Sequence, residues 1–239
     1  MTPRINEIWV YLATSPLLGL TLTLLAYQGA RYVHRRCGGH PLANPVLLAV
    51  SALVGLLWLT DTPYRTYFDG AQFVHFLLGP ATVALAIPLY AQLDLLKRMA
   101  LPLLVALLIG SLTAALSAIA IGGVLGASKA TLLSLAPKSV STPIAMGIAE
   151  RLGGLPSLTA VLVILTGVLG AILARYVYRA LHIADDAQRG FAIGIAAHGI
   201  GTARAFQESE QMGAFTALAM GLNGLTTALL LPMVIPWFV

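Results

Sequence analysis

Charged residues are scarce in this chain of 239 residues: 10% are Asp, Glu, Lys or Arg, whereas 58% are hydrophobic. A soluble globular domain carries about 25% charged residues, so this composition indicates a protein whose solvent is lipid. The net charge of +5 does not indicate nucleic-acid binding. Arg31, Arg35 and Arg36 form a juxtamembrane cluster of the kind that sets membrane orientation, and no stretch has the composition of a soluble domain with a basic face.

Cysteine is also nearly absent. The single Cys37 excludes an internal disulfide and a thiolate metal cage. The sequence contains no His-Glu-x-x-His, Gly-x-Ser-x-Gly or P-loop motif. Lys138 and Ser139 are neighbours in sequence and would point apart on a helix, so they do not predict a Ser-Lys dyad. We therefore expect no enzyme, no metal and no other cofactor, and no ATP-driven mechanism.

The sequence contains six long runs without a charged residue. Each run is at least as long as the roughly 20 residues that a bilayer-spanning helix needs. The sequence therefore predicts an all-α polytopic membrane protein with about six full spans. The runs are Ile8–Ala30, Cys37–Thr60, Gly70–Leu93, Met99–Ser128, Leu152–Ala174 and Gln211–Val239.

Two further apolar segments, 127–150 and 190–204, are interrupted by charge, proline or glycine. We expect broken helices or re-entrant hairpins here, whose backbone must be buried in protein or face water. The positive-inside rule places the basic loops, including Lys97 with Arg98 and the segment 175–189, in the cytoplasm. That orientation makes segment 127–150 turn back within the membrane, whereas a strict inverted repeat would let it cross.

Prolines suggest an internal repeat. Residues 78–87 match residues 135–144 in Leu, Pro, Val and Ile, and a span that starts with Leu-Pro follows each segment. Proline removes a backbone donor and presses on the preceding turn, so we expect breaks at Pro80, Pro88, Pro137 and Pro143. In segment 190–204 we expect the break at Gly199 and Gly201. Interrupted segments in corresponding positions indicate the midplane binding site of a transporter. Chance matches in a chain rich in Leu and Ala are the alternative.

Ionisable groups at membrane depth are costly, so those that are retained are functional candidates. Lys138 follows Pro137 and precedes the hydroxyls of Ser139, Ser141 and Thr142. In a broken helix, freed backbone donors, hydroxyls and an ammonium group would converge on an anion. The alternative is a lysine that reaches from a helix end to the membrane interface.

A second candidate group lies near the C-terminus. Arg204 suits bidentate recognition of a carboxylate, or else pairs with Glu208 or Glu210. His198 precedes Gly199 and Gly201, which permit close approach of backbone to a ligand, and it could carry a coupled proton or serve only as hydrogen-bonded structure. Thr202, and Asn223 within an apolar run, could line the same cavity or bond between helices.

Several motifs together resemble the LrgB/CidB family of bacterial inner-membrane proteins, whose plant relatives include the plastid glycolate/glycerate translocator. The motifs are Leu-Ala-Pro-Lys-Ser-Val-Ser-Thr-Pro at 135–143, Ala-His-Gly-Ile-Gly-Thr-Ala-Arg at 197–204 and Ala-Leu-Ala-Met-Gly-Leu-Asn-Gly at 217–224. The resemblance covers residues 70–239, so we expect one transmembrane domain with an N-terminal helical pair at 1–69.

The resemblance implies export or exchange of small monocarboxylates such as glycolate, glycerate, lactate or pyruvate. It also implies an alternative, antiholin-like control of murein hydrolases and autolysis with a holin-like LrgA/CidA partner. Carriers of this kind are commonly homodimers. A carboxylate held by Lys138 or Arg204, with its hydroxyl near Ser139, Ser141, Thr142 or Asn223, fits the transport function.

Overall fold

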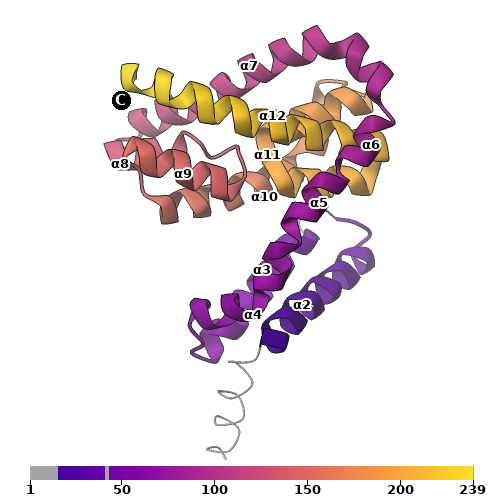
Figure 1. Ribbon diagram of the computed structural model, residues 1–239, viewed down its shortest axis with the longest axis vertical. Helices are drawn as coiled ribbons and strands as arrows, with labels where there is room; N and C mark the ends of the chain where they lie inside the picture. Colours follow the sequence, from indigo (N-terminus) through magenta and orange to yellow (C-terminus); the bar gives the residue numbers. More distant parts are fainter. Residues whose placement is uncertain (1–15, 41–42, 239) are drawn as a thin grey trace, which may run out of the picture. The chain divides into compact units, whose positions relative to one another are not determined.

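A computed structural model describes residues 16–40 and 43–238 of the chain. The described residues are helical throughout and form no strand, as the composition predicts (Figure 1). The chain forms two compact units, Met1–Ala84 and Leu85–Val239. Residue 69, where the sequence resemblance placed the end of the N-terminal part, lies within α4 of the first unit.

The N-terminal unit contains α2 (Pro16–Arg36), α3 (Pro45–Leu59), α4 (Tyr64–Phe76) and α5 (Leu78–Ala84). Asn44 caps α3, because its side-chain oxygen accepts from the N–H groups of Val46 and Leu47. Thr23 of α2 and Tyr67 of α4 share a hydrogen bond of 2.8 Å. Of the predicted span Ile8–Ala30, residues 8–15 lie outside the described part, and the rest belongs to α2.

The predicted breaks at Pro80 and Pro88 occur just before each proline. Single residues, Leu77 and Leu85, separate α4 from α5 and α5 from α6 (Ala86–Tyr90). Each proline then sits in the first turn of a new helix, where a missing N–H has no cost. The predicted span Gly70–Leu93 is thus broken, although segments 64–74 and 79–90 together are apolar enough to cross a membrane as one bent span.

Three helices of the C-terminal unit are long and apolar enough to cross a membrane: α7 (Leu93–Val124), α10 (Pro156–Ala180) and α12 (Glu210–Val234). They confirm three of the six predicted spans. Helix α7 begins six residues earlier than predicted and runs through Lys97 and Arg98, since long basic side chains at a helix end can reach the interface. Helix α3, with 15 residues, is shorter than a full span.

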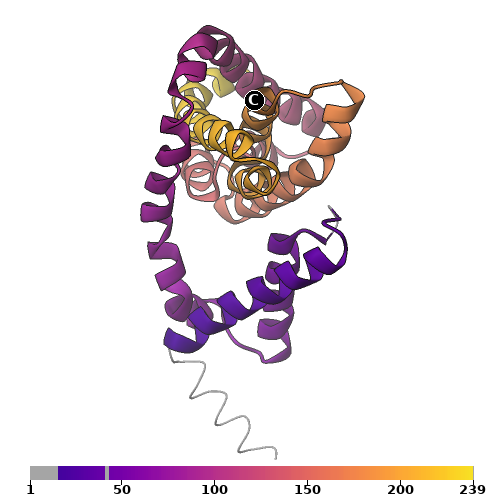
Figure 2. The same ribbon diagram turned by 90° about the vertical axis from the view of Figure 1, so that its right-hand side faces the viewer.

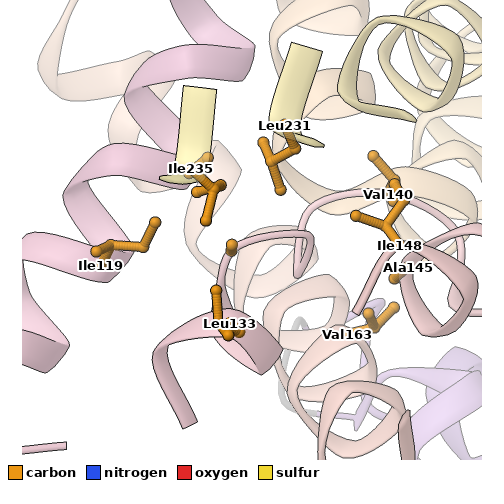
Figure 3. Close-up of a cluster of buried hydrophobic side chains, with 10 residues drawn as sticks. Ile119, Leu133, Val140, Ala145, Ile148, Val163, Leu231 and Ile235 are labelled. Carbon is orange, nitrogen blue, oxygen red and sulfur yellow. The ribbon is translucent and has the colours of Figure 1, made fainter. Parts of the chain in front are cut away.

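Segment 127–150 enters the bundle and turns back. It consists of α8 (Lys129–Leu135), a turn over residues 136–141 and α9 (Thr142–Leu152). Beyond α9, the N–H of Leu155 donates to the Ser134 hydroxyl at 2.8 Å, so the end of α9 lies beside α8. Leu133 of α8 and Ile148 of α9 belong to one buried apolar cluster with Ile119 of α7 and Leu231 of α12 (Figure 3). Segment 127–150 therefore folds back on itself as a helical hairpin.

Helix α11 (Asp186–Glu208) is a second hairpin. His198 has non-helical backbone angles, φ 41° and ψ −134°, and divides the helix into two legs. The Arg189 guanidinium on the first leg pairs with the Glu208 carboxylate on the second at 2.8 Å. In a straight helix these residues, 19 positions apart, would be separated by about 28 Å. The legs therefore fold back on one another.

The two hairpins enter from opposite ends of the bundle. The α8–α9 hairpin starts where α7 ends, and α10 then leads to the other end. There Met99 at the start of α7 packs with Ala187 of α11 and Phe215 of α12. A hairpin followed by a span thus occurs twice, in opposite directions. The repeat that the prolines predicted is a different one, since it pairs residues 78–87, which here belong to the two short helices α5 and α6, with residues 135–144.

The end where α7 begins carries six of the basic residues of this unit: Lys97, Arg98, Arg175, Arg179, Arg189 and Arg204. We call it the basic end. The opposite end carries only Lys129 and Arg151. By the positive-inside rule, we expect the basic end to face the cytoplasm. This is the orientation that the basic loops of the sequence predict.

Glycines let the first leg of α11 approach α12 closely, and the two helices lie side by side, orange and yellow, in Figures 1 and 2. A Cβ atom at Gly190 would lie 2.3 Å from the Met212 carbonyl oxygen, and one at Gly194 would lie 2.4 Å from that of Thr216. Small residues four apart are the usual means by which membrane helices bring their backbones together.

We predict that Gly194→Ala destabilises the protein by roughly 1–3 kcal/mol, because the added methyl group overlaps backbone that cannot move aside. The measurement is thermal unfolding of the purified protein in detergent. Gly221→Ala on α12 is the matched control, since a Cβ atom there meets nothing within 4 Å. Equal melting temperatures for the two variants would contradict the close packing of α11 on α12.

Candidate functional site

Buried polar side chains of the C-terminal unit gather where the two hairpins meet. They come from α7, the α8–α9 turn, the break and second leg of α11, and α12, at about the middle of the long helices. A protein that spans lipid has little reason to hold polar groups at this depth unless they serve function or satisfy backbone. We call this set the central polar cluster: Ser111, Ser139, His198, Thr202, Asn223 and Thr227.

Asn223 is the centre of this cluster. Its amide nitrogen donates to the backbone carbonyls of Ser139, at 3.2 Å, and Ile195, at 3.1 Å. Its amide oxygen accepts from the hydroxyls of Ser111, at 2.5 Å, and Thr227, at 3.3 Å. Both donor hydrogens and both acceptor positions of the amide are therefore used.

The two carbonyls that Asn223 satisfies belong to the tips of the two hairpins. Ser139 lies in the turn between α8 and α9, and Ile195 lies in the last turn before the break at His198. The last four carbonyls of a helix have no partner within that helix. In a lipid-embedded bundle such groups need another donor. A single side chain thus joins the interrupted backbone of both hairpins.

His198 holds the tip of α11 in a strained conformation. A positive φ is unfavourable for a residue with a Cβ atom, costing on the order of 1–3 kcal/mol, and persists only when the surroundings enforce it. The ring Nε2 lies 2.9 Å from the Val163 carbonyl oxygen of α10. Since a carbonyl only accepts, Nε2–H is the donor. Gly167 makes room for the ring, because a Cβ atom there would lie 2.7 Å from its Cε1 atom.

The second leg of α11 begins with small and hydroxylic residues. The Thr202 hydroxyl donates to the carbonyl of His198 at 3.0 Å. A Cβ atom at Gly201 would lie 3.1 Å from the carbonyl oxygen of Ile193, so this glycine permits the legs to pack together. Gly199 is exposed beside the break. His198 and Thr202 therefore lie at the tip of the α11 hairpin, whose Ile195 carbonyl bonds Asn223.

Lys138 lies at the tip of the α8–α9 hairpin. Its ammonium group donates to the Ser139 hydroxyl at 3.2 Å, and its side chain is half-buried. Among the described residues, no carboxylate lies within 4 Å of this ammonium group. Ser139 also offers its carbonyl to Asn223, so Lys138 is one residue from the central polar cluster. A cation without a protein counter-ion is available to an anionic ligand.

The N-terminus of α9 lies directly after Lys138. Ser141 occupies the N-cap position but makes no side-chain capping bond, and Thr142 begins the helix. Pro143 lies in the first turn of α9, where proline is favoured, and the break over residues 136–141 precedes it, as breaks precede Pro80 and Pro88. Pro137 is buried in the turn itself. The helix end presents unpaired N–H groups and two half-buried hydroxyls, a combination that suits an anion.

Arg204 is committed to an ion pair. It binds Glu208 at 3.0 Å, and Glu208 also binds Arg189. Asp186 joins the group through Arg189, at 3.2 Å, and through the Ser209 hydroxyl, at 2.6 Å. This ionic network holds the open end of the α11 hairpin and the start of α12 together. The sequence left two roles open for Arg204, binding of a carboxylate ligand or an ion pair with a nearby glutamate. The structure shows the ion pair with Glu208.

Sequence reasoning missed several partners in this site. Ser111 and Thr227 are single hydroxyl residues in long apolar helices, where they could equally bond their own backbone. The carbonyls of Val163 and Ile195 carry no signal in a sequence at all. No three His, Cys, Asp or Glu side chains come together as a metal site in the part of the chain that the structure describes.

Comparison with known proteins identifies relatives over nearly the whole chain. The sequence model of the LrgB-like family matches residues 23–237. The uncharacterized proteins YwbG and YxaC of Bacillus subtilis (strain 168) are 38% and 33% identical, and cover 92% and 90% of this chain and 97% and 94% of their own lengths. The antiholin-like protein LrgB of Bacillus cereus is 28% identical over 93% of this chain and 97% of its own. No solved structure matches.

We predict that His198→Gly is more stable than His198→Ala by about 1 kcal/mol, in thermal unfolding measured in detergent. Both variants lose the hydrogen bond to Val163, but only alanine keeps a Cβ atom at positive φ. Ala197→Gly, at the residue before the break, should in contrast make the protein less stable than wild type, because residue 197 is helical and glycine is unfavourable there. Equal stability at position 198 would show that the backbone there is unstrained.

Proposed function

Because the chain belongs to the LrgB-like family, we propose that it is a secondary carrier of small monocarboxylates, such as glycolate, glycerate, lactate or pyruvate, in the bacterial inner membrane. The observation that carries the proposal is the pair of oppositely directed hairpins whose tips Asn223 joins in the middle of the bundle. Interrupted helices that meet at mid-depth are the usual setting of a carrier's binding site.

The charge at the α8–α9 tip supports an anionic substrate. A half-buried ammonium group at this depth is costly, and an incoming carboxylate compensates it. We assign the carboxylate to Lys138 and the N-terminus of α9, where the hydroxyls of Ser141 and Thr142 are within reach of a small 2-hydroxy or 2-oxo group. Arg204 is not needed, because Glu208 already neutralises it.

Alternating access follows from the two hairpins. While Asn223 bonds both tips, the substrate site lies between them and is closed from both sides. Release of one tip would open the site to the side from which that hairpin enters, and Asn223 would keep the other tip in place. The carrier would need no ATP under this scheme, and the gradient of the carboxylate or of a coupled ion would drive transport.

An antiholin-like regulator is the second candidate, favoured by the name of the Bacillus cereus relatives. A regulator of murein hydrolases would act through a holin-like partner of the LrgA/CidA kind. This chain would bind that partner either as a monomer or as a homodimer. In that case the purified protein moves no carboxylate, and affinity purification from membranes retrieves the partner. A channel, in contrast, gives carboxylate flux that neither saturates nor exchanges.

We predict that Lys138→Met lowers the initial rate of labelled glycolate, glycerate, lactate or pyruvate uptake into proteoliposomes at least about tenfold, since a charge-assisted contact contributes about 1.5–3 kcal/mol. Lys138→Arg, which keeps the charge, should retain saturable uptake. Lys129→Met, on the exposed first residue of α8, is the matched control. If Lys138→Met folds stably and its saturable uptake equals that of wild type, Lys138 does not bind the substrate carboxylate.

We predict a different result for Arg204→Gln. The substitution removes the ion pair with Glu208, so it should lower the melting temperature but leave the apparent KM for the carboxylate within about twofold of wild type. Arg179→Gln, on an exposed residue of α10, controls for loss of a positive charge at the basic end. A raised KM without a change in melting temperature would place Arg204 in the substrate site instead.

A further inference from the structure

The last turns of α2, in the N-terminal unit, carry a pocket of about 260 Å³. Gln28, Arg31, Tyr32 and Arg35 line this pocket, which we call the α2 pocket. Residues three, four and seven positions apart share one face of a helix, so these four side chains surround the same space. Each of them can donate a hydrogen bond, and a guanidinium group cannot accept one. The lining of the α2 pocket therefore suits an anion.

No acidic side chain offsets the two arginines of the α2 pocket. Residues 8–60 contain no Asp or Glu. Among the described residues, no carboxylate lies within 4 Å of the guanidinium group of Arg31 or Arg35. Like charges four positions apart on a helix repel each other, and an anion between them would remove that repulsion. The α2 pocket thus holds positive charge that the described protein does not neutralise.

Both acidic residues in the described part of this unit lie elsewhere. Asp61 follows α3, and the 15 residues of α3 place it about 22 Å along the helix axis from the loop that follows α2. Asp69 belongs to α4, which crosses the first half of α2: a Cβ atom at Gly19 would lie 2.9 Å from the Cα atom of Gly70. Gly19 and Arg31 are about 18 Å apart along α2. Neither carboxylate is in position to neutralise the pocket.

Helix polarity and membrane orientation explain part of this basic group. Cations are favoured in the last turn of a helix, and arginines beside a span set its orientation. Arg36 needs no ligand, because its guanidinium group lies 5.2 Å from the centroid of the Tyr32 ring. Neither effect accounts for Gln28, which lies two turns before the end of α2 and lines the same pocket as Arg31 and Arg35. The gathering of these three donors indicates a ligand.

The face of α2 that carries the pocket continues as hydrocarbon. Leu17 and Leu24 lie on the same stripe as Gln28, Arg31 and Arg35, since these positions recur every three, four or seven residues. Both leucine side chains are exposed. Leu17 and Gln28 are separated by about 16 Å along the helix axis, which matches the half-thickness of about 15 Å of a membrane's hydrocarbon core. The stripe thus offers hydrocarbon contacts over one leaflet and cations at its surface.

We propose that the α2 pocket binds the phosphate group of one anionic phospholipid, whose acyl chain lies along Leu24 and Leu17. The planar forks of Arg31 and Arg35 match phosphate oxygens, and the Gln28 amide donates a further hydrogen bond. Basic juxtamembrane segments favour anionic headgroups, and by the positive-inside rule we expect this end of α2 to lie in the cytoplasmic leaflet. The site belongs to a different unit from Lys138, so it is independent of the transported substrate.

Native mass spectrometry of the full-length protein in detergent tests the proposal, with phosphatidylglycerol and phosphatidylcholine of identical acyl chains as probes. Wild type should retain phosphatidylglycerol more strongly than phosphatidylcholine, which carries no net charge. Arg31→Gln and Arg35→Gln should each weaken phosphatidylglycerol retention about fivefold. Gln28→Leu should weaken it about threefold although the net charge is unchanged, because one hydrogen bond to the phosphate is lost.

Arg65→Gln is the matched control. Arg65 is an exposed arginine of the same unit, on α4, and does not line the α2 pocket. Phosphatidylglycerol retention by this variant should equal that of wild type. Glycerol phosphate, which has the phosphate group without acyl chains, should not displace phosphatidylglycerol at equal concentration. Melting temperatures without added lipid should be the same for all variants, since each exchanges an exposed side chain.

Four outcomes would overturn the proposal. Equal retention of both lipids by wild type would show that the headgroup is not recognised. Unchanged retention by Arg31→Gln and Arg35→Gln would place the lipid elsewhere. An equal loss in Arg65→Gln would show that diffuse surface charge attracts the lipid. Displacement by glycerol phosphate would make a soluble phosphate the ligand. Because every readout is lipid binding or stability, a failure of the carboxylate transport assay leaves this result unaffected.

Discussion

The hydrogen bonds from Asn223 to the carbonyls of Ser139 and Ile195 are the contact on which the C-terminal unit depends. Lipid offers no partner to an exposed backbone carbonyl, so a hairpin that turns within the membrane must find its partners inside the protein. Two hairpins turn here, and their tips share one amide group. Helices α7, α10 and α12 surround the two hairpin tips, because the polar groups of the tips must be buried inside the protein.

This constraint also explains the distribution of tight and loose packing. Gly190 and Gly194 bring the first leg of α11 into backbone contact with α12, which carries Asn223. The opposite side of the same leg faces α7 across an apolar groove. A hairpin held firmly by one helix and loosely by another moves more easily relative to the second.

Charge at the two hairpins is arranged in two different ways. At the open end of α11, Arg189, Arg204, Asp186 and Glu208 neutralise one another in a closed network. At the tip of α8–α9, Lys138 contacts only a hydroxyl. Ion pairs of the first kind stabilise structure, whereas a half-buried cation without a carboxylate partner is a candidate for binding an anionic ligand, which is the role proposed for Lys138. The contrast separates two basic residues that the sequence presented as equivalent.

The sequence by itself determined that the protein lies in a lipid membrane and is all-helical. It also determined three of the spans and the two interrupted segments, because hydropathy and proline act locally. It also indicated Lys138, His198, Thr202 and Asn223, since polar groups in apolar runs stand out. It could not determine that α11 folds back at His198, because a histidine takes positive φ less readily than the neighbouring Gly199 or Gly201. Nor could it pair α8–α9 with α11, or assign Arg204 to Glu208. Those features depend on contacts between residues far apart in the chain, which only the tertiary structure brings together.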